Sequence, residues 1–121
     1  MENVIKTKKL GKLKIYVEPS HKVKNASSFF RKIFPKSVHL HIIAEAKKEG
    51  IINASVYQTH SGFIQGGGIE KYHLEGNNSR LALCIELIDS RERLEAFFLK
   101  HHSLLKSKVV IYKEVEFWET E

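Results

Sequence analysis

The chain has 121 residues, of which 42% are apolar and 28% are charged, and its net charge is +6. This length and composition fit one folded domain, since domains commonly have about 100–150 residues, and they exclude a disordered chain. A single cysteine, Cys84, excludes an internal disulfide, and no apolar run reaches the roughly 18–20 residues that span a bilayer. The N-terminus lacks the apolar segment of a signal peptide. We therefore expect a single cytoplasmic domain over residues 1–121.

Positive charge is concentrated at the start of the chain. Residues 1–36 hold ten lysines and arginines against two glutamates, whereas the remaining 85 residues carry a net charge of −2. Such asymmetry is found in proteins that contact nucleic acids or anionic membranes. Arginine is scarce here and no aromatic residue stands among the lysines of residues 1–9. We therefore favour a solvated, flexible basic tail over residues 1–9.

The first half of the chain contains a strand, a short amphipathic segment, a helix and a second strand. Residues 13–17 alternate apolar and polar side chains, which is typical of a half-buried strand. Residues 26–34 carry four apolar side chains at helical spacing, and this segment is expected to pack on the domain or on a neighbouring subunit. A helix is predicted over residues 38–49, with Gly50 as its stop, and a strand over residues 51–59.

The middle of the chain has the composition of a loop. Residues 61–78 are rich in glycine and asparagine, with a brief hairpin indicated over residues 69–74. Ordering such a segment costs about 1–2 kcal/mol of backbone entropy per residue. We therefore predict a mobile loop at residues 61–78 that becomes ordered on binding a partner or a small anion.

The second half supplies another strand, a helix and a last strand. Residues 81–88 form the clearest strand pattern, and Asp89 is predicted to cap the next helix, with Glu92 completing a capping box. The last strand is predicted over residues 109–118. The order β-α-β-β-α-β predicts a ferredoxin-like α+β fold, in which a four-stranded antiparallel sheet carries both helices on one face.

The other face of that sheet should then be open, yet the third strand is apolar on both sides. Leu81 and its alternate neighbours occupy one face, while Ala82, Cys84 and Ile88 occupy the other. An exposed apolar patch usually marks an interface. We therefore predict a homo-oligomer in which Ala82, Cys84 and Ile88 face a neighbouring subunit.

Four stretches of the sequence resemble the PII-like proteins of the family known as domain of unknown function 190. The resemblance lies in an opening strand, a helix end with the following strand, a Gly-Phe pair, and a strand that runs into a charged helix. These stretches are Leu13-Lys14-Ile15-Tyr16-Val17, residues 45–56 (EAKKEGIINASV), Gly62-Phe63 and residues 81–93 (LALCIELIDSRER). Together they cover roughly residues 10–118.

The resemblance implies a fold like that of PII signalling proteins and copper-tolerance proteins. Such proteins are typically trimers with a mobile loop between the second and third strands, here residues 61–78. PII proteins bind adenine nucleotides between subunits and present this loop to membrane transporters or enzymes. Their glycine-rich phosphate loop ending in Gly-Lys is absent, because residues 102–108 read HSLLKSK.

The candidate ligand residues belong to the loop and to a set of lysines that could come together where two subunits meet. Successive backbone amides of a glycine run can hold an anion, and lysines can add charge to such a site. We place the ligand site near the base of the loop. Its candidate residues are Thr59, His60, Gly66, Gly67, Gly68, Lys71, Lys106 and Lys108.

No metal site, cofactor or catalytic residue is expected from the sequence. His39 and His41 are two positions apart on a predicted helix, so they cannot share an ion from one chain. His101 falls on the apolar stripe of the last helix and is interpreted as a packed core histidine. Cys84 lies mid-strand, where a buried thiol is inert.

These observations favour a PII-like regulatory oligomer that binds a small anion, such as a nucleotide, and acts through its loop on a partner protein. Two alternatives stay open. One is a nucleic-acid-binding ferredoxin-like module, which would need exposed aromatics on its first and third strands, where only Tyr16 is available. The other is a metal-binding oligomer.

Overall fold

The computed structural model describes residues 4–18, 38–63, 68–72 and 81–120. The segment at residues 26–34 and the glycines Gly66 and Gly67 lie outside these ranges. The elements, in chain order, are β1 (Ile5–Val17), α2 (Val38–Lys48), β2 (Asn53–Gln58), β3 (Ser61–Gly62), β4 (Glu70–Lys71), β5 (Leu83–Asp89), α3 (Arg91–Lys100), α4 (His102–Leu105) and β6 (Val109–Thr120).

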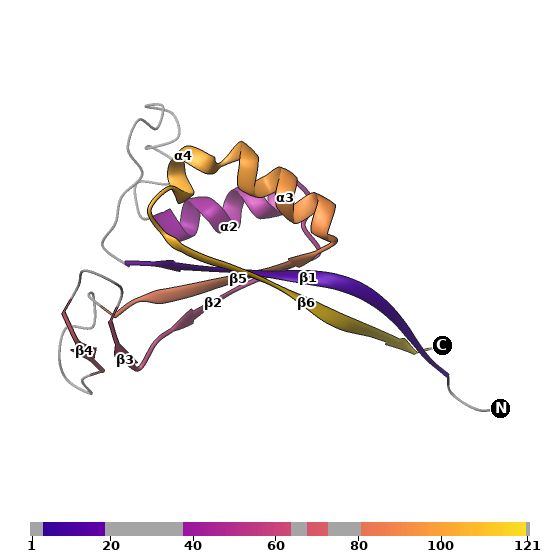
Figure 1. Ribbon diagram of the computed structural model, residues 1–121, viewed down its shortest axis with the longest axis horizontal. Coiled ribbons are helices and arrows are strands. Elements are labelled where there is room, and N and C mark those ends of the chain that lie inside the picture. Colours follow the sequence, from indigo (N-terminus) through magenta and orange to yellow (C-terminus); the bar gives the residue numbers. More distant parts are fainter. Residues whose placement is uncertain (1–3, 19–37, 64–67, 73–80, 121) are drawn as a thin grey trace.

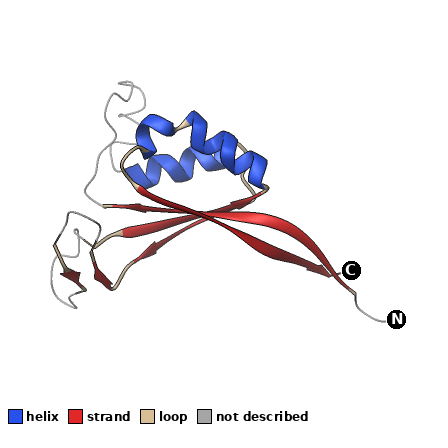
Figure 2. Ribbon diagram, in the orientation of Figure 1, coloured by secondary structure: helices blue, strands red, loops and turns tan. Residues whose placement is uncertain are grey.

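The fold has two layers, a twisted antiparallel sheet and a layer of helices (Figures 1 and 2). The sheet order is β2-β5-β1-β6, and β3 pairs with β4 in a separate small ribbon. All described helices lie on one face of the sheet (Figure 1). The predicted ferredoxin-like α+β fold is therefore confirmed.

The core lies between the helices and the central strands. Alternate residues of β1 and β5 point into it, as period-two patterning requires. They meet the inward stripes of α2 and α3. The buried residues of this core are Leu13, Ile15, Val17, Val38, Ile42, Ala46, Leu83, Ile85, Leu87, Leu94, Phe97 and Leu105.

The helix α2 ends at a glycine, as predicted. Gly50 has a φ of +77°, which favours glycine because it has no Cβ. The Ile51 N–H donates to the carbonyl of Ala46 at 3.0 Å, and the Gly50 N–H donates to the carbonyl of Lys47 at 3.1 Å. This reversal turns the chain from the helix layer back into strand β2.

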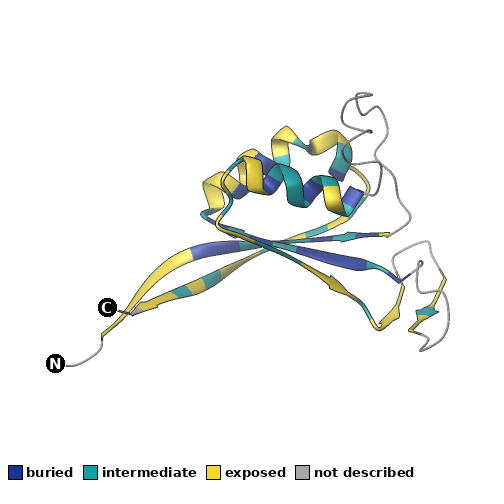
Figure 3. Ribbon diagram, turned by 180° about the vertical axis from the view of Figure 1, so that it is seen from behind, coloured by how far each residue is buried: buried dark blue, intermediate teal, exposed yellow. Residues whose placement is uncertain are grey.

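The first strand is longer than predicted. It begins at Ile5, and its residues Ile5 to Leu10 pair with β6 alone, in a register that sets Ile5 opposite Thr120. The expected flexible tail at residues 1–9 is therefore wrong for Ile5–Lys9, which belong to a strand. This part of β1 and the end of β6 run beyond the helices as an exposed two-stranded ribbon (Figure 3). Backbone pairing rather than burial makes it a strand, so its side chains carry no alternating pattern.

The predicted helix cap at Asp89 is also wrong. Strand β5 extends through Asp89, and Ser90 is the N-cap, whose hydroxyl accepts from the Arg93 N–H at 3.3 Å. The buried Asp89 carboxylate instead accepts from the Ile52 N–H at 3.0 Å and from the Ser90 N–H at 2.6 Å. It therefore ties the α2–β2 connection to the start of α3.

Candidate ligand-binding site and helix-free face

The helix-free face of the sheet carries one row of apolar and aromatic side chains. The register places Tyr57 beside Cys84, Cys84 beside Tyr16, and Tyr16 beside Val109. This row, Tyr57–Cys84–Tyr16–Val109, crosses all four strands. Tyr57 is 54% exposed and Val109 37% exposed, and no described helix covers this face. A row of this kind can pack against another protein surface.

The cysteine in this row is buried even within one chain. Burial raises the pKa of the Cys84 thiol, although a hydrogen bond to Tyr16 works in the opposite direction. The nearby Cys84 and the partial burial of its own ring raise the pKa of Tyr16. The thiol therefore stays protonated near neutral pH, as expected for a packing residue rather than a nucleophile.

The neighbouring positions on the same face are more polar than the third strand alone suggested. Lys12 forms an ion pair with Glu86 at 3.2 Å, and Lys14 stands opposite Glu86 in the register. Ile88 shares the face and is half-buried. Ala82 precedes β5, and its carbonyl accepts a hydrogen bond from the Thr59 hydroxyl. Self-association through Ala82, Cys84 and Ile88 stays a prediction.

The base of the β2–β5 connection is held by two sets of contacts. Both the N–H and the hydroxyl of Thr59 donate to the carbonyl of Ala82, at 2.9 and 2.7 Å. The ring of His60 stacks on Tyr72 with centroids 5.2 Å apart, and the Tyr72 N–H donates to the carbonyl of His60 at 2.6 Å. These contacts, with the pairing of Ser61 and Lys71, form the small β3–β4 hairpin, which joins residues 61–62 to residues 70–71 rather than lying within residues 69–74 as the sequence indicated.

The structure brings only part of the predicted ligand site together. His60 and Lys71 belong to the β3–β4 hairpin, and Gly68 is exposed beside it. Lys106 and Lys108 lie in the α4–β6 connection, at the same end of the sheet but on its helix side (Figure 1). Ser107 between them has a φ of +70°, a tight turn that sets the two lysines around one corner. Within one chain, the hairpin and this lysine corner are therefore on different layers.

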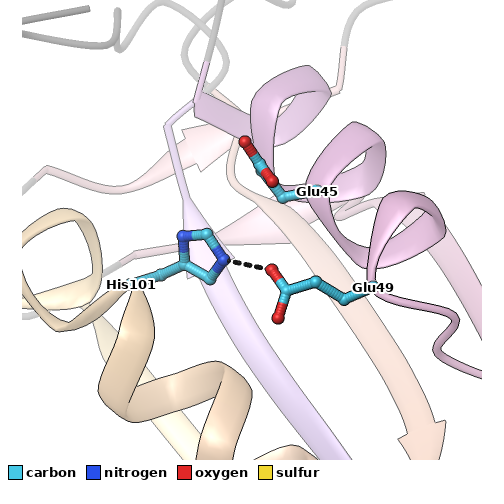
Figure 4. A group of neighbouring side chains, drawn as sticks. All are labelled: Glu45, Glu49 and His101. Carbon is cyan, nitrogen blue, oxygen red and sulfur yellow. Dashed lines mark hydrogen bonds and ion pairs between the residues drawn. The ribbon is translucent and has the colours of Figure 1, made fainter.

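A second group of side chains was not predicted. Glu45 and Glu49 from the end of α2 lie beside His101, which separates α3 from α4 (Figure 4). The His101 Nε2 lies 2.7 Å from a Glu49 carboxylate oxygen, and the His101 ring packs on Phe97 with centroids 4.4 Å apart. His101 is therefore packed, as interpreted, but it also makes a polar contact with α2. The i, i+4 spacing of Glu45 and Glu49 was the available signal, since it puts both on one helix face.

The predicted helix after Asp89 is thus two helices. His101 has φ −104° and ψ 22°, outside helical geometry, and α4 continues only from His102 to Leu105.

Within the described ranges, no helix is long and apolar enough to cross a membrane.

Comparison with known proteins places this fold. CPII, a nitrogen regulatory PII-like protein from Thiomonas intermedia K12 in a structure with ADP, AMP and bicarbonate, is 18% identical, with a TM-score of 0.62 over 93% of this chain and 91% of that one. Its apo form is 14% identical, with a TM-score of 0.56 over 96% and 99% of the two chains. A protein from Thermus thermophilus, named as a putative PII-like signalling protein, is 15% identical, with a TM-score of 0.53 over 93% and 91%.

These likenesses establish the PII-like fold. No curated protein matches the sequence at a significant level. The family comparison, however, matches residues 10–117 with DUF190, described as an uncharacterized ACR. That match spans the sheet and the helices from the middle of β1 almost to the end of β6. The chain therefore belongs to the DUF190 family and has a PII-like fold.

Proposed function

We propose that this protein is a regulatory homo-oligomer, most simply a trimer, that binds a small anionic ligand at its subunit boundaries. The ligand is an adenine nucleotide, and the β2–β5 connection passes the bound state to a partner protein. The observation that carries the proposal is the apolar row Tyr57–Cys84–Tyr16–Val109 on the helix-free face. Covering the exposed side chains at the two ends of this row, Tyr57 and Val109, with a second surface would lower the free energy.

Assembly would also bring together candidate ligand residues that are apart within one chain. The β3–β4 hairpin and the Lys106–Lys108 corner lie at one end of the sheet but on different layers of one chain. A neighbouring subunit packed on the helix-free face can bring its own residues to the hairpin. The lysines then supply the positive charge that a Gly-Lys phosphate loop supplies in PII proteins, as the shared fold with the ADP-bound CPII structure supports.

The proposed role is binding rather than catalysis. The one thiol is buried, and its pKa is raised by that burial. The Thr59 hydroxyl donates to a backbone carbonyl, so it serves to fix the base of the connection. Both side chains therefore have structural roles, and the proposed site serves to recognise an anion.

Light scattering coupled to size-exclusion chromatography tests the assembly, with Tyr57→Asp as the variant and Leu99→Asp as its control. Leu99 is 70% exposed on the helix layer, so a charge there leaves the sheet face unchanged. An uncompensated buried charge costs about 3–5 kcal/mol, which weakens assembly by more than about a hundredfold. We expect Tyr57→Asp to be monomeric and Leu99→Asp to remain oligomeric. A monomeric parent protein at micromolar concentration would refute the assembly.

Calorimetric titration with ADP and AMP tests the ligand. The variant Lys106→Ala/Lys108→Ala should bind the nucleotide at least about tenfold more weakly, since each lost charge-assisted contact is worth about 1.5–3 kcal/mol. The control Lys47→Ala/Lys48→Ala removes two lysines from the end of α2 and should bind normally. Equal weakening in both double variants would mean that only overall charge matters, and the lysine corner would then not be the site.

A further inference from the structure

The group Glu45, Glu49 and His101 combines the side chains that borderline metal ions prefer. One ligand atom from each residue lies within 4.8 Å of the other two, and all three residues are half-buried. The carboxylates come from the C-terminal part of α2 and the imidazole from the α3–α4 junction (Figure 4). Imidazole and carboxylate oxygen together are a known donor set for Zn²⁺.

The separations match such a site after small side-chain rotations. Ligand atoms around a tetrahedral zinc ion at a bond length near 2.1 Å are about 3.4 Å apart. The His101–Glu49 contact of 2.7 Å is shorter than this spacing, so an ion would replace that hydrogen bond and push the two atoms slightly apart. Glutamate side chains have the rotatable bonds needed to close the longer separations.

The second carboxylate, that of Glu45, distinguishes this group from a simple ion pair. Glu49 is already paired with His101 and lies 3.6 Å from the Lys100 ammonium. Glu45 is half-buried, lies beside His101 and also interacts electrostatically with His41, one turn earlier on α2. A half-buried carboxylate is costly unless it is paired or binds a cation. The cluster therefore places two half-buried carboxylates beside one imidazole, with the exposed Lys100 as the ammonium nearest to Glu49.

The surroundings fix the imidazole and leave room for an ion to replace the lysine. The ring of His101 packs against Phe97 and lies edge-on to His41, with centroids 6.2 Å apart. Lys100 is 59% exposed in its side chain, so its ammonium can move into solvent when a divalent ion neutralises Glu49. We propose that Glu45, Glu49 and His101 bind one Zn²⁺ ion that links α2 to α3, with a remaining position open to water.

The experiment uses tag-free protein and two probes, Zn²⁺ in calorimetry and Co²⁺ in visible absorption spectroscopy. We expect one ion per chain, d–d absorption bands from Co²⁺, and a higher melting temperature with Zn²⁺, because the ion binds only the folded site. Glu45→Gln is the most informative variant, since it removes a ligand charge while keeping the size and shape of the side chain. It should lower Zn²⁺ affinity at least about tenfold, as loss of a direct ligand does at least as much damage as loss of an outer partner.

His101→Ala should abolish the Co²⁺ bands, and its circular dichroism reports whether it folds. The matched control is His102→Ala, which removes an exposed neighbouring histidine and should leave binding intact. Zn²⁺ affinity unchanged in Glu45→Gln would overturn the proposal, because the ions would then be held by scattered surface histidines. Absence of saturable binding by the parent protein would overturn it too, and the cluster would be only a contact between two helices. Neither result depends on nucleotide binding.

Discussion

The ring of Tyr112 lies over Gly11 and occupies the space that a Cβ at that position would need. The guanidinium of Arg91 also lies 5.0 Å from the centroid of this ring. A methyl group at Gly11 must displace the ring and disturb the contact between β6 and α3. We expect Gly11→Ala to lower the free energy of unfolding by about 1–3 kcal/mol, the usual cost of overpacking.

Urea unfolding checks this prediction, and Gly68→Ala is its control. A Cβ at Gly68 would meet no atom within 4 Å, so that variant should change stability little. Equal stability of the two alanine variants would show that Tyr112 moves aside without cost.

The buried Asp89 carboxylate should contribute strongly to stability. It accepts from two backbone N–H groups and lies 3.7 Å from the Arg93 guanidinium. In Asp89→Ala both N–H groups lose their acceptor, which costs about 1–3 kcal/mol for each group left unsatisfied. The control, Glu95→Ala, removes an exposed i, i+4 pair with Arg91 and should cost no more than about 0.5 kcal/mol. Thermal unfolding measures the stability of both variants. A similar small loss of stability in each would contradict the conclusion that Asp89 ties the α2–β2 connection to α3.

The thiol of Cys84 predicts how stability changes at alkaline pH. Burial raises its folded-state pKa above the ordinary value of 9.0. The stability that the neutral thiol contributes is therefore complete below pH 9.0 and is lost as the pH rises through the higher folded-state value. Unfolding free energies measured from about pH 7 to about pH 10.5 should fall, and they should fall less steeply in Cys84→Ala. An identical slope in the two proteins would assign the decline to other groups, such as Tyr16.

The basic start of the chain should bind nucleic acid only weakly. Lys8 pairs with Glu119 at 3.2 Å, and Lys12 pairs with Glu86 at the same distance. Lysines that already face carboxylates release few phosphate counterions on binding, so affinity should be low and independent of base sequence. Fluorescence anisotropy with labelled single- and double-stranded DNA checks this. A sub-micromolar complex at physiological salt would contradict this prediction and favour the nucleic-acid-binding alternative.

The sequence predicted those parts of the fold that burial controls. Leu13, Ile15 and Val17 alternate because one side of β1 meets the helices, and such patterning is local. The start of β1 at Ile5 could not be read in this way, because only its pairing with the distant β6 makes it a strand. The cap at Ser90 was missed because the choice between neighbouring capping residues depends on where β5 ends.

The two candidate sites also differ in whether local sequence could predict them. The candidate ligand site at Thr59 and His60 was predicted from composition and resemblance, and it stays a prediction. The cluster around His101 was not predicted, because Glu49 lies 52 residues away and the contact exists only after two helices pack together. A histidine on an apolar stripe gives no local sign of its partner.

The pairing of Ile5 with Thr120 has a consequence for how the chain folds. Strand β1 is synthesised well before β6, so the edge of β1 that pairs with β6 stays unpaired until β6 has been made. Contacts between such distant parts of a sequence form late and slowly, because their loop-closure entropy must be overcome first. During synthesis, the unpaired edge of β1 is therefore a surface that another nascent chain could occupy. The lysines Lys6, Lys8, Lys12 and Lys14 along this strand disfavour that encounter by mutual repulsion until β6 pairs with it.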